Sequence, residues 1–214
     1  MVIAADRQIE ERLKAGLATM GIETPPERVV AMGRLLVLLD KWNRAFNLTA
    51  VRDMEEMVSR HILDSLSARP FLTGTSILDV GTGPGFPGLP LAMVEPQRHF
   101  TLLDSGGKKI RFVRHAIGEL GLENVLPEQV RVEAFEPADL YDVVISRAFS
   151  SLADFVRRCG CLVANGGQLL AMKGRYPDAE LTELPSGWLV QAVTSLRVPG
   201  LAGERHMVVL ERAG

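Results

Sequence analysis

The stretch Ser76-Ile77-Leu78-Asp79-Val80-Gly81-Thr82-Gly83-Pro84-Gly85-Phe86-Pro87-Gly88 decides the fold of this chain. Its apolar start, Ile77 to Val80, predicts a short strand that leads directly into a turn with four glycines. Because each glycine costs conformational entropy when it is ordered, this density indicates a backbone that bends sharply and approaches a ligand closely. The apolar residues 89–94 predict a helix packed against the strand. A strand, a glycine-rich turn and a helix, with an acid at the strand's end, predict a nucleotide-type binding site.

Two patterns in this turn point to different ligands. The dinucleotide fingerprint G-x-G-x-x-G runs from Gly83 through Gly85 to Gly88, but such a glycine-rich loop satisfies many spacings by chance. The stronger pattern places Asp79 two residues before Gly81, as Asp-Val-Gly-x-Gly-x-Gly. A carboxylate there reaches toward a cationic ligand or holds the loop, and it repels a pyrophosphate. The pattern resembles motif I of S-adenosylmethionine-dependent methyltransferases, whose cofactor carries a sulfonium cation. A glycine-rich turn without any ligand is the alternative.

Beyond this turn, strands alternate with helices until the end of the chain breaks the pattern. A strand over 100–103 ends at Asp104, 25 residues after Asp79, where this fold places an acid for ribose hydroxyls. Two final strands, separated by Pro199-Gly200, have no helix between them and therefore pair antiparallel. Such a hairpin is typical of methyltransferases, whereas NAD-binding sheets usually finish with a parallel strand. We predict a Rossmann-like class I methyltransferase domain over 71–214, with helices at 107–120 and 151–164 and further strands at 129–134, 141–146, 167–172, 189–198 and 206–210.

Residues 1–70 predict an N-terminal helical extension. Ile9, Leu13 and Leu17 are spaced by four and form one apolar stripe. Gly21 ends this first helix, and a second helix runs from the capping sequence at 24–27 to about Trp42. A third helix is predicted over about 53–68, and Pro70 closes it.

The composition describes a soluble globular protein, with 47% hydrophobic and 23% charged residues among 214. No run approaches the roughly 20 apolar residues of a membrane span, and Met1 to Ile9 carry no signal peptide. We therefore expect a cytoplasmic protein, a monomer without membrane partners. The two cysteines, Cys159 and Cys161, predict buried free thiols and no metal site. The net charge of −2 argues against a broad polyanion-binding surface but leaves a local basic cluster open.

One such cluster lies on the helix predicted to start at Gly107. It has no acid from Ser105 to Gly118 and carries Lys108, Lys109, Arg111, Arg114 and His115. Residues 108, 111 and 115 share a helix face. A solvated face is one interpretation. The other is a phosphate-contacting RNA patch beside the cofactor mouth, joined from the strand ends by Lys173, Arg175 and Arg205.

Arg147 follows the fourth predicted strand, at the edge where ligands bind open sheets. The motifs of three other methyltransferase classes are missing here. There is no Asn/Asp-Pro-Pro-Tyr of exocyclic-amine enzymes, and both cysteines lie over ten residues on, too far for a C5-pyrimidine nucleophile. Nor does this position carry the Asp of the Lys-Asp-Lys-Glu set of ribose 2′-O enzymes. Guanine N7 has a free lone pair and needs no general base, so alignment suffices. Arg147 then anchors the cofactor's carboxylate or an RNA phosphate, unless it pairs with a nearby acid. His61, one turn before Asp64, packs in its helix or positions the base.

Taken together, the motifs resemble one family, the small-subunit rRNA guanine-N7 methyltransferases called RsmG or GidB. The resemblance covers about residues 28–210 and implies S-adenosylmethionine-dependent N7 methylation of guanine 527 in the decoding-site loop of 16S rRNA, free or in a small-subunit particle. It adds cofactor contacts at Gly81, Phe86, Val132-Glu133 and Arg147. The motifs, in order, are Asn47-Leu48-Thr49-Ala50, His61-Ile62-Leu63-Asp64-Ser65, the Asp79–Gly88 turn, Leu102-Leu103-Asp104-Ser105, Ile145-Ser146-Arg147-Ala148-Phe149, Met172-Lys173-Gly174, Pro199-Gly200 and Gly203-Glu204-Arg205-His206.

Two other classes stay open at this point. A nicotinamide dehydrogenase is disfavoured by Asp79 and by the final hairpin, and comparing the binding of NADH and S-adenosylmethionine separates the two. A non-catalytic rRNA-binding or assembly factor on the same fold is disfavoured by the intact glycine turn, and a labelled methyl-transfer assay decides it.

Overall fold

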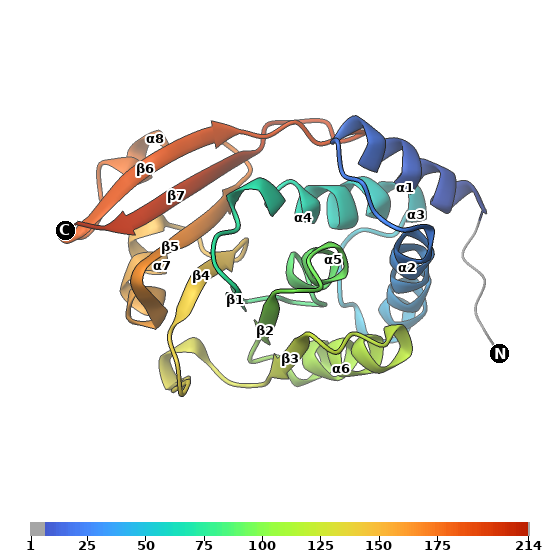
Figure 1. Cartoon of the computed structure of the whole chain (residues 1–214), viewed down its shortest axis with the longest axis horizontal. Helices are drawn as coiled ribbons and strands as arrows, with labels where there is room; N and C mark the ends of the chain where they lie inside the picture. The colour runs from blue at the N-terminus through green and yellow to red at the C-terminus, as the bar shows by residue number, and fades with distance from the viewer. Residues whose placement is uncertain (1–6, 214) are drawn as a thin grey trace.

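The computed structural model describes residues 7–213 and places a seven-stranded sheet at the centre of the chain (Figure 1). The strand order is β3-β2-β1-β4-β5-β7-β6. All neighbours pair parallel except β7, which is antiparallel to β5 and β6. This confirms the predicted parallel sheet with a final antiparallel hairpin. The strands are β1 (Ser76–Val80), β2 (His99–Leu103), β3 (Val125–Glu128), β4 (Tyr141–Ser146), β5 (Val163–Lys173), β6 (Trp188–Ser195) and β7 (His206–Arg212).

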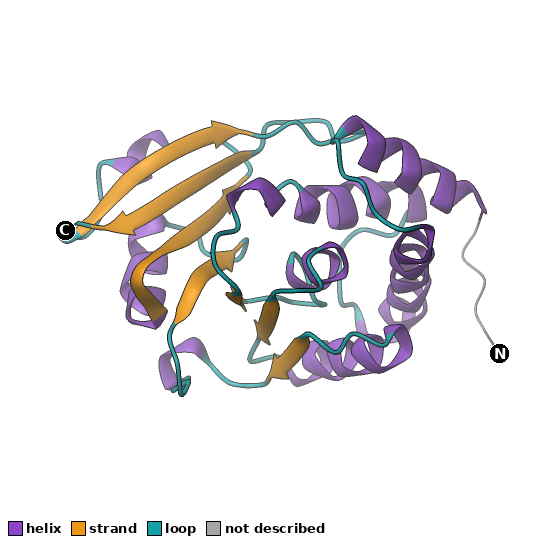
Figure 2. Cartoon of the chain, in the orientation of Figure 1, coloured by secondary structure: helices purple, strands orange, loops and turns teal. Residues whose placement is uncertain are grey.

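Helices cover both faces of this sheet (Figure 2). One face carries the N-terminal helices together with α5 and α6, and the other carries α7. The helices are α1 (Arg7–Thr19), α2 (Pro26–Phe46), α3 (Met54–Met57), α4 (Asp64–Leu66), α5 (Gly88–Val94), α6 (Gly107–Leu120), α7 (Leu152–Cys159) and α8 (Asp178–Leu181). A π-helix, η1 (Val58–Leu63), joins α3 to α4, and short 3₁₀ turns are η2 (Arg69–Phe71), η3 (Val132–Ala134) and η4 (Gly160–Leu162).

Strand alternation divides the buried side chains into two clusters. In β1, Ile77 packs among the N-terminal helices, whereas Leu78 packs toward α7. The cluster on the first side runs without interruption from Leu13 of α1 to Val209 of β7. Residues 7–66 therefore bury their apolar face against the same sheet that carries the glycine turn. The domain boundary at residue 70 stays a prediction.

Several sequence predictions are wrong in detail. The helix predicted over 151–164 ends at Cys159, and the strand predicted at 167–172 already begins at Val163. The third strand lies at Val125–Glu128 rather than 129–134, and residues 132–134 form a 3₁₀ turn. β3 contains Pro127, whose missing N–H is tolerated because β3 is an edge strand paired only with β2. The third helix is interrupted by the π-helix. Cys159 is buried as expected, but Cys161 is exposed because it lies in the 3₁₀ turn after α7.

Within residues 7–213 no helix is long and apolar enough to cross a membrane. The expectation that the chain begins without a signal peptide falls largely on residues 1–6, which lie outside the described part of the chain.

Candidate active site

The carboxylate of Asp79 holds the glycine turn from beneath. Its side chain is fully buried, and Oδ2 accepts hydrogen bonds from the Thr82 hydroxyl at 2.6 Å and the Gly88 N–H at 2.8 Å. Burial raises the pKa of Asp79 to about 6, because the charged form loses its water. Of the two roles predicted for Asp79, the structure supports the one that holds the loop.

The turn itself has the backbone that only glycine adopts easily. Gly81, Gly83 and Gly85 have φ angles of 70°, 61° and 95°. A Cβ on Gly81 would lie 2.7 Å from the Cβ of Ala148, in the segment after β4. The turn after β1 and the segment after β4 therefore approach each other closely at the carboxyl edge of the sheet, and a side chain at Gly81 would close the gap between them.

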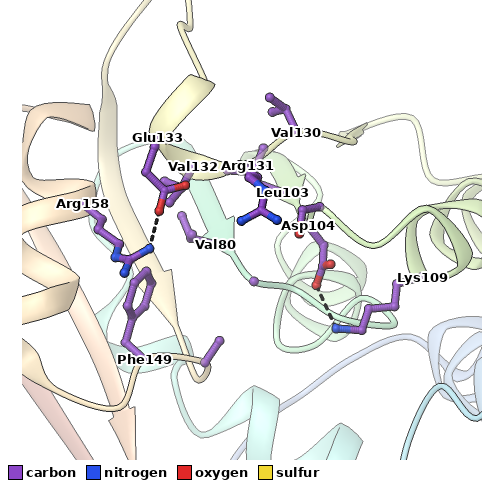
Figure 3. A pocket seen from close by; sticks show the side chains of 13 residues that line it. Val80, Leu103, Asp104, Lys109, Val130, Arg131, Val132, Glu133, Phe149 and Arg158 are labelled. Atoms are coloured by element: carbon purple, nitrogen blue, oxygen red, sulfur yellow. Dashed lines mark hydrogen bonds and ion pairs between the residues drawn. The ribbon is translucent and has the colours of Figure 1, made fainter.

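A cleft opens at this edge (Figure 3). It brings together four of the predicted cofactor residues, Gly81, Asp104, Val132 and Glu133. Arg131 and Arg158 also line it, and no sequence motif pointed to either. Arg158 forms an ion pair with Glu133, across the cleft wall between α7 and the turn after β3. Glu133 has its pKa lowered by hydrogen bonding, first to its own backbone and then to Arg158.

Asp104 is fixed by three donors at the opposite wall of the cleft. Oδ2 accepts from the Gly83 N–H at 3.0 Å and from Lys109 Nζ at 3.3 Å, and Oδ1 accepts from the Gly106 N–H at 2.7 Å. Oδ1 retains acceptor capacity for a hydroxyl group, whereas the two donors to Oδ2 use both of its lone pairs. The hydrogen bond from Gly83 ties the acid at the end of β2 to the glycine turn after β1. Lys109 belongs to this cleft, although the sequence pattern placed it in an RNA patch.

A second cavity lies beyond β4, and cations line it. Arg147, Lys173 and Arg205 contribute side chains from the ends of β4, β5 and the segment before β7. Asp64 of α4 pairs with two of them: Oδ2 accepts from Arg147 Nη1 at 2.9 Å and Oδ1 from Arg205 Nε at 3.1 Å. Arg147 therefore does pair with an acid, and it lines this second cavity rather than the cleft. Asp64 belongs to one of the sequence motifs, but its role was not predicted.

Lys173 links the same cavity to the segment after β4. Its Nζ forms an ion pair with Glu180 at 2.7 Å and donates to the carbonyl of Phe149 at 3.3 Å. Phe149 also lines the cleft. The segment over residues 147–149 thus lies between the two cavities: Arg147 lines the second cavity, and Ala148 and Phe149 line the cleft.

His61 and Phe86 lie beneath the site and line neither cavity. Their rings stack with centroids 4.7 Å apart, and the exposed fractions are 7% and 2%. His61 Nε2 hydrogen-bonds Thr49 Oγ1 at 3.0 Å. Burial, with Arg147 nearby, lowers the pKa of His61 to about 4. The pair supports the glycine turn, and direct contact of either ring with a ligand stays a prediction.

The remaining predicted RNA residues are on the surface. Lys108, Arg111 and Arg114 are exposed along α6, and Arg175 is exposed just after β5. Arg175 lies within three residues of Lys173 but does not line the second cavity.

The strand order, the hairpin β6–β7, the glycine turn after β1 and the acid after β2 together define a class I S-adenosylmethionine-dependent methyltransferase. Solved structures share this fold. TrmN from Thermus thermophilus matches with a TM-score of 0.56 and 20% identity, over 73% of this chain and 53% of that one. A ribosomal protein L11 methylase from Lactobacillus delbrueckii subsp. bulgaricus matches with a TM-score of 0.54 and 14% identity, over 71% and 77%.

Sequence relatives define the family within this class. The family model for rRNA small subunit methyltransferase G matches residues 29–208. The protein of that name from Marinobacter nauticus is 50% identical over 202 residues, 94% of each chain. Its counterpart from Salmonella arizonae is 53% identical over 174 residues, 81% of this chain and 84% of that one. The chain therefore belongs to the rRNA small subunit methyltransferase G family, as its motifs predicted.

Proposed function

We propose that this protein methylates N7 of one guanine of 16S rRNA, guanine 527 in the decoding-site loop. S-adenosylmethionine, when bound, supplies an electrophilic methyl group. The observation that carries the proposal is the pair of cavities divided by residues 147–149. One has the acid and glycine turn that suit an adenosine, and the other has cations that suit a nucleotide's phosphate. Donor and acceptor would then meet at the segment between them.

The residues of the cleft fit the cofactor in kind. Oδ1 of Asp104 has acceptor capacity for a ribose hydroxyl, and Val132 offers apolar surface for an adenine. The turn at Gly81, which has no room for a side chain, would let the cofactor's methionine part approach the backbone. Lys109 and Arg158 line the cleft too, but each is paired with an acid, Asp104 or Glu133. Arg131 lines the cleft as well, so its walls carry three cations against two acids.

The second cavity favours an acceptor that needs no proton removed. Among the described residues that line it, Asp64 is the one acid, and both of its oxygens already accept from arginines. Neither cysteine lines it. Both oxygens of Asp64 are therefore occupied, and its charge offsets that of Arg147 and Arg205. Both features suit N7, because positive charge moves onto the base during transfer.

His206 allows the absence of a general base to be tested. It lines the cavity, it is 8% exposed, and its Nδ1 has no hydrogen-bond partner among the described residues. If methylation required a base, His206 would be the available group. We expect His206→Asn to keep methyl transfer within about fivefold of wild type, since general base catalysis contributes about a hundredfold or more. A loss of that larger size would contradict N7 chemistry.

The position of the methyl group is measured directly. Protein and labelled S-adenosylmethionine are incubated with unmethylated small-subunit rRNA, and N7-methylguanine is detected by borohydride–aniline strand cleavage. Cleavage at guanine 527 is expected. A methyl group on an exocyclic amine or ribose oxygen contradicts the proposal, and no transfer at all favours a non-catalytic rRNA-binding factor.

The substrate form follows from where N7 lies. N7 is on the major-groove edge, and in A-form RNA that groove is too deep and narrow for protein side chains. The guanine must therefore lie in a loop or be flipped out. We expect good activity on rRNA or small-subunit particles with an accessible loop and poor activity on 70S ribosomes. Equal rates on all forms would contradict this accessibility requirement alone.

A further inference from the structure

Helices α2 and α6 lie side by side (Figure 1), and each carries exposed basic residues. Contacts along the pair show that they run antiparallel. Arg34 bonds the Glu119 carbonyl, Trp42 lies 5.3 Å from His115 between ring centroids, and Phe46 lies under the Arg111 guanidinium at 5.9 Å. The C-terminal end of α2 is therefore beside the first half of α6, the half that begins at the cofactor cleft with Lys109.

Two segments of these helices and of the loop after α2 carry basic residues and no acids. Residues 41–52 contain no Asp or Glu, and neither do residues 105–118. The first segment exposes Lys41, Arg44 and Arg52, of which Arg44 pairs with Asp40, and the second exposes Lys108, Arg111 and Arg114. Arg52 is anchored at the end of α2, where it donates to the Asn43 carbonyl and to Asn47 Oδ1 at 2.7 Å. In a chain whose net charge is −2, this concentration of cations is a local feature.

An aromatic side chain lies in the middle of these cations. Phe46 is the last residue of α2 and is 36% exposed. It packs on Trp42 at 5.3 Å, so its ring is held in place while part of it faces solvent. Exposed aromatic rings among cations are the arrangement with which proteins bind single-stranded nucleic acid, since bases stack on the ring and phosphates contact the cations.

We propose that this α2–α6 surface (Lys41, Phe46, Arg52, Lys108, Arg111 and Arg114) binds unpaired rRNA next to the target guanosine, with a base stacked on Phe46. The inference rests on the proposed function. It gives the N-terminal helices a role in substrate binding that the basic residues of α6 alone did not suggest. Lys108 immediately precedes Lys109 of the cofactor cleft, so RNA bound here is continuous with the site.

The charge part of the inference is tested by binding an unmethylated 16S rRNA transcript over a range of salt concentrations. Removal of one cation that binds a phosphate lowers the slope of log affinity against log salt by about 0.7–0.9. We expect Lys41→Ala with Arg52→Ala to lower the slope by about 1.5 and to leave S-adenosylmethionine binding unchanged. A matched control replaces two exposed cations elsewhere, Lys14 of α1 and Arg197 after β6, and should leave the slope unchanged.

The stacking part is tested with Phe46→Leu, which keeps apolar packing on Trp42 but removes the aromatic face. We expect a loss of about fivefold or more in affinity for the transcript, and Phe46→Trp should retain wild-type affinity. Leu189→Ala removes a side chain that is 59% exposed on the edge strand β6 and should have no effect. Thermal melting of each variant shows that it is folded.

The outcomes separate this inference from the proposed function. If wild type neither binds nor methylates the transcript, the proposed function fails. If wild type binds and methylates, while the Lys41/Arg52 and Phe46 variants bind like wild type, only the α2–α6 surface is wrong. Variants that bind the transcript normally but bind small-subunit particles weakly would show that the surface contacts a ribosomal protein, which also overturns the inference.

Discussion

The cofactor cleft and the cation-lined cavity differ in how far apart in the sequence their parts lie. In the cleft, Asp79 bonds residues three and nine positions away, and Asp104 bonds Gly83 at a separation of 21. In the cavity, Asp64 bonds Arg147 and Arg205 at separations of 83 and 141. The glycine-turn side of the first site is built from the adjacent turns after β1 and β2, and the opposite wall comes from residues 130–133, 148–149 and Arg158. The second exists only when the N-terminal helices are placed against the end of the chain.

This difference predicts that the cleft binds the cofactor and the cavity binds the RNA substrate, and mutations can test this. Changes to the local site should affect the cofactor alone, whereas changes to Asp64 should affect the RNA substrate and also the free energy of unfolding. The reason is that long-range ion pairs hold the N-terminal helices to the last strands, whereas the turn is held by its own backbone and by Asp79.

The largest effect is expected for Gly83→Asp. Gly83 has a φ of 61°, and its N–H donates to Asp104. A non-glycine residue there costs about 1–2 kcal/mol of strain, and the new carboxylate would lie close to the Asp104 carboxylate. We expect S-adenosylmethionine binding, measured by calorimetry, to fall below detection while the circular dichroism spectrum persists. Gly83→Ala is the matched control: no atom of the described residues lies within 4 Å of the added Cβ, so it reports the strain alone. Wild-type affinity in the aspartate variant would contradict the cofactor assignment.

The same difference in sequence separation explains what could be predicted from sequence. The glycine turn, Asp104 and the hairpin are local patterns, and the structure has each of them. The role of Asp64 could not be predicted, because its partners lie 83 and 141 positions away. The third strand was misplaced because β3 is defined by its pairing with β2, which is a property of the assembled sheet. Arg131 and Arg158 line the cleft from a turn and from a helix, and neither residue belongs to a motif that could have predicted its role.

The second largest effect is expected for Asp64→Ala, which leaves Arg147 and Arg205 without their shared partner. Misplacement of Arg147 beside the reacting groups should lower methyl transfer to rRNA by about a hundredfold. The loss of two charge-assisted hydrogen bonds should also lower the free energy of unfolding by about 2 kcal/mol. Cofactor affinity should stay within about twofold, since Asp64 does not line the cleft.

Asp40 provides the control for this variant. It forms an ion pair with Arg44 on the surface of α2, at 2.6 Å. Exposed pairs of this kind contribute about 0.5 kcal/mol, so Asp40→Ala should change neither activity nor stability by much. If Asp64→Ala weakened cofactor binding as strongly as methyl transfer, the two cavities would not be independent sites.

A smaller effect separates two neighbouring lysines. Lys109 bonds Asp104 in the cleft, whereas Lys108 is exposed on the α2–α6 surface. We expect Lys109→Ala to weaken cofactor binding by up to about fivefold, as the loss of a partly exposed ion pair allows. Lys108→Ala should leave cofactor binding unchanged and lower the salt slope of rRNA binding by about 1. Identical effects of both substitutions would remove the distinction between cleft and RNA surface.

The smallest effects concern the dependence of stability on pH, where Asp79 and His61 act in opposite directions. The pKa of Asp79 is raised from 3.8 to about 6, so its contribution to stability is present below pH 4 and is lost as pH rises through 6. The pKa of His61 is lowered from 6.5 to about 4, so folding disfavours its charged form, and stability is lost as pH falls from 6.5 toward 4. Between pH 4 and 6 the two contributions largely cancel in the wild type.

Replacing one member of the pair should therefore reveal the other. Asp79→Asn keeps an oxygen that accepts from Thr82 and Gly88 but does not titrate, so this variant should lose stability more steeply than wild type as pH falls from 6 to 4. His61→Gln retains a partner for Thr49 and should become relatively more stable over the same range. Buried sites relax around a charge, so we expect changes of about 1 kcal/mol, a few degrees in melting temperature. All other carboxylates are common to the three proteins and cancel in the comparison. If melting temperature varied with pH in the same way in both variants and in wild type, neither group would titrate in this range.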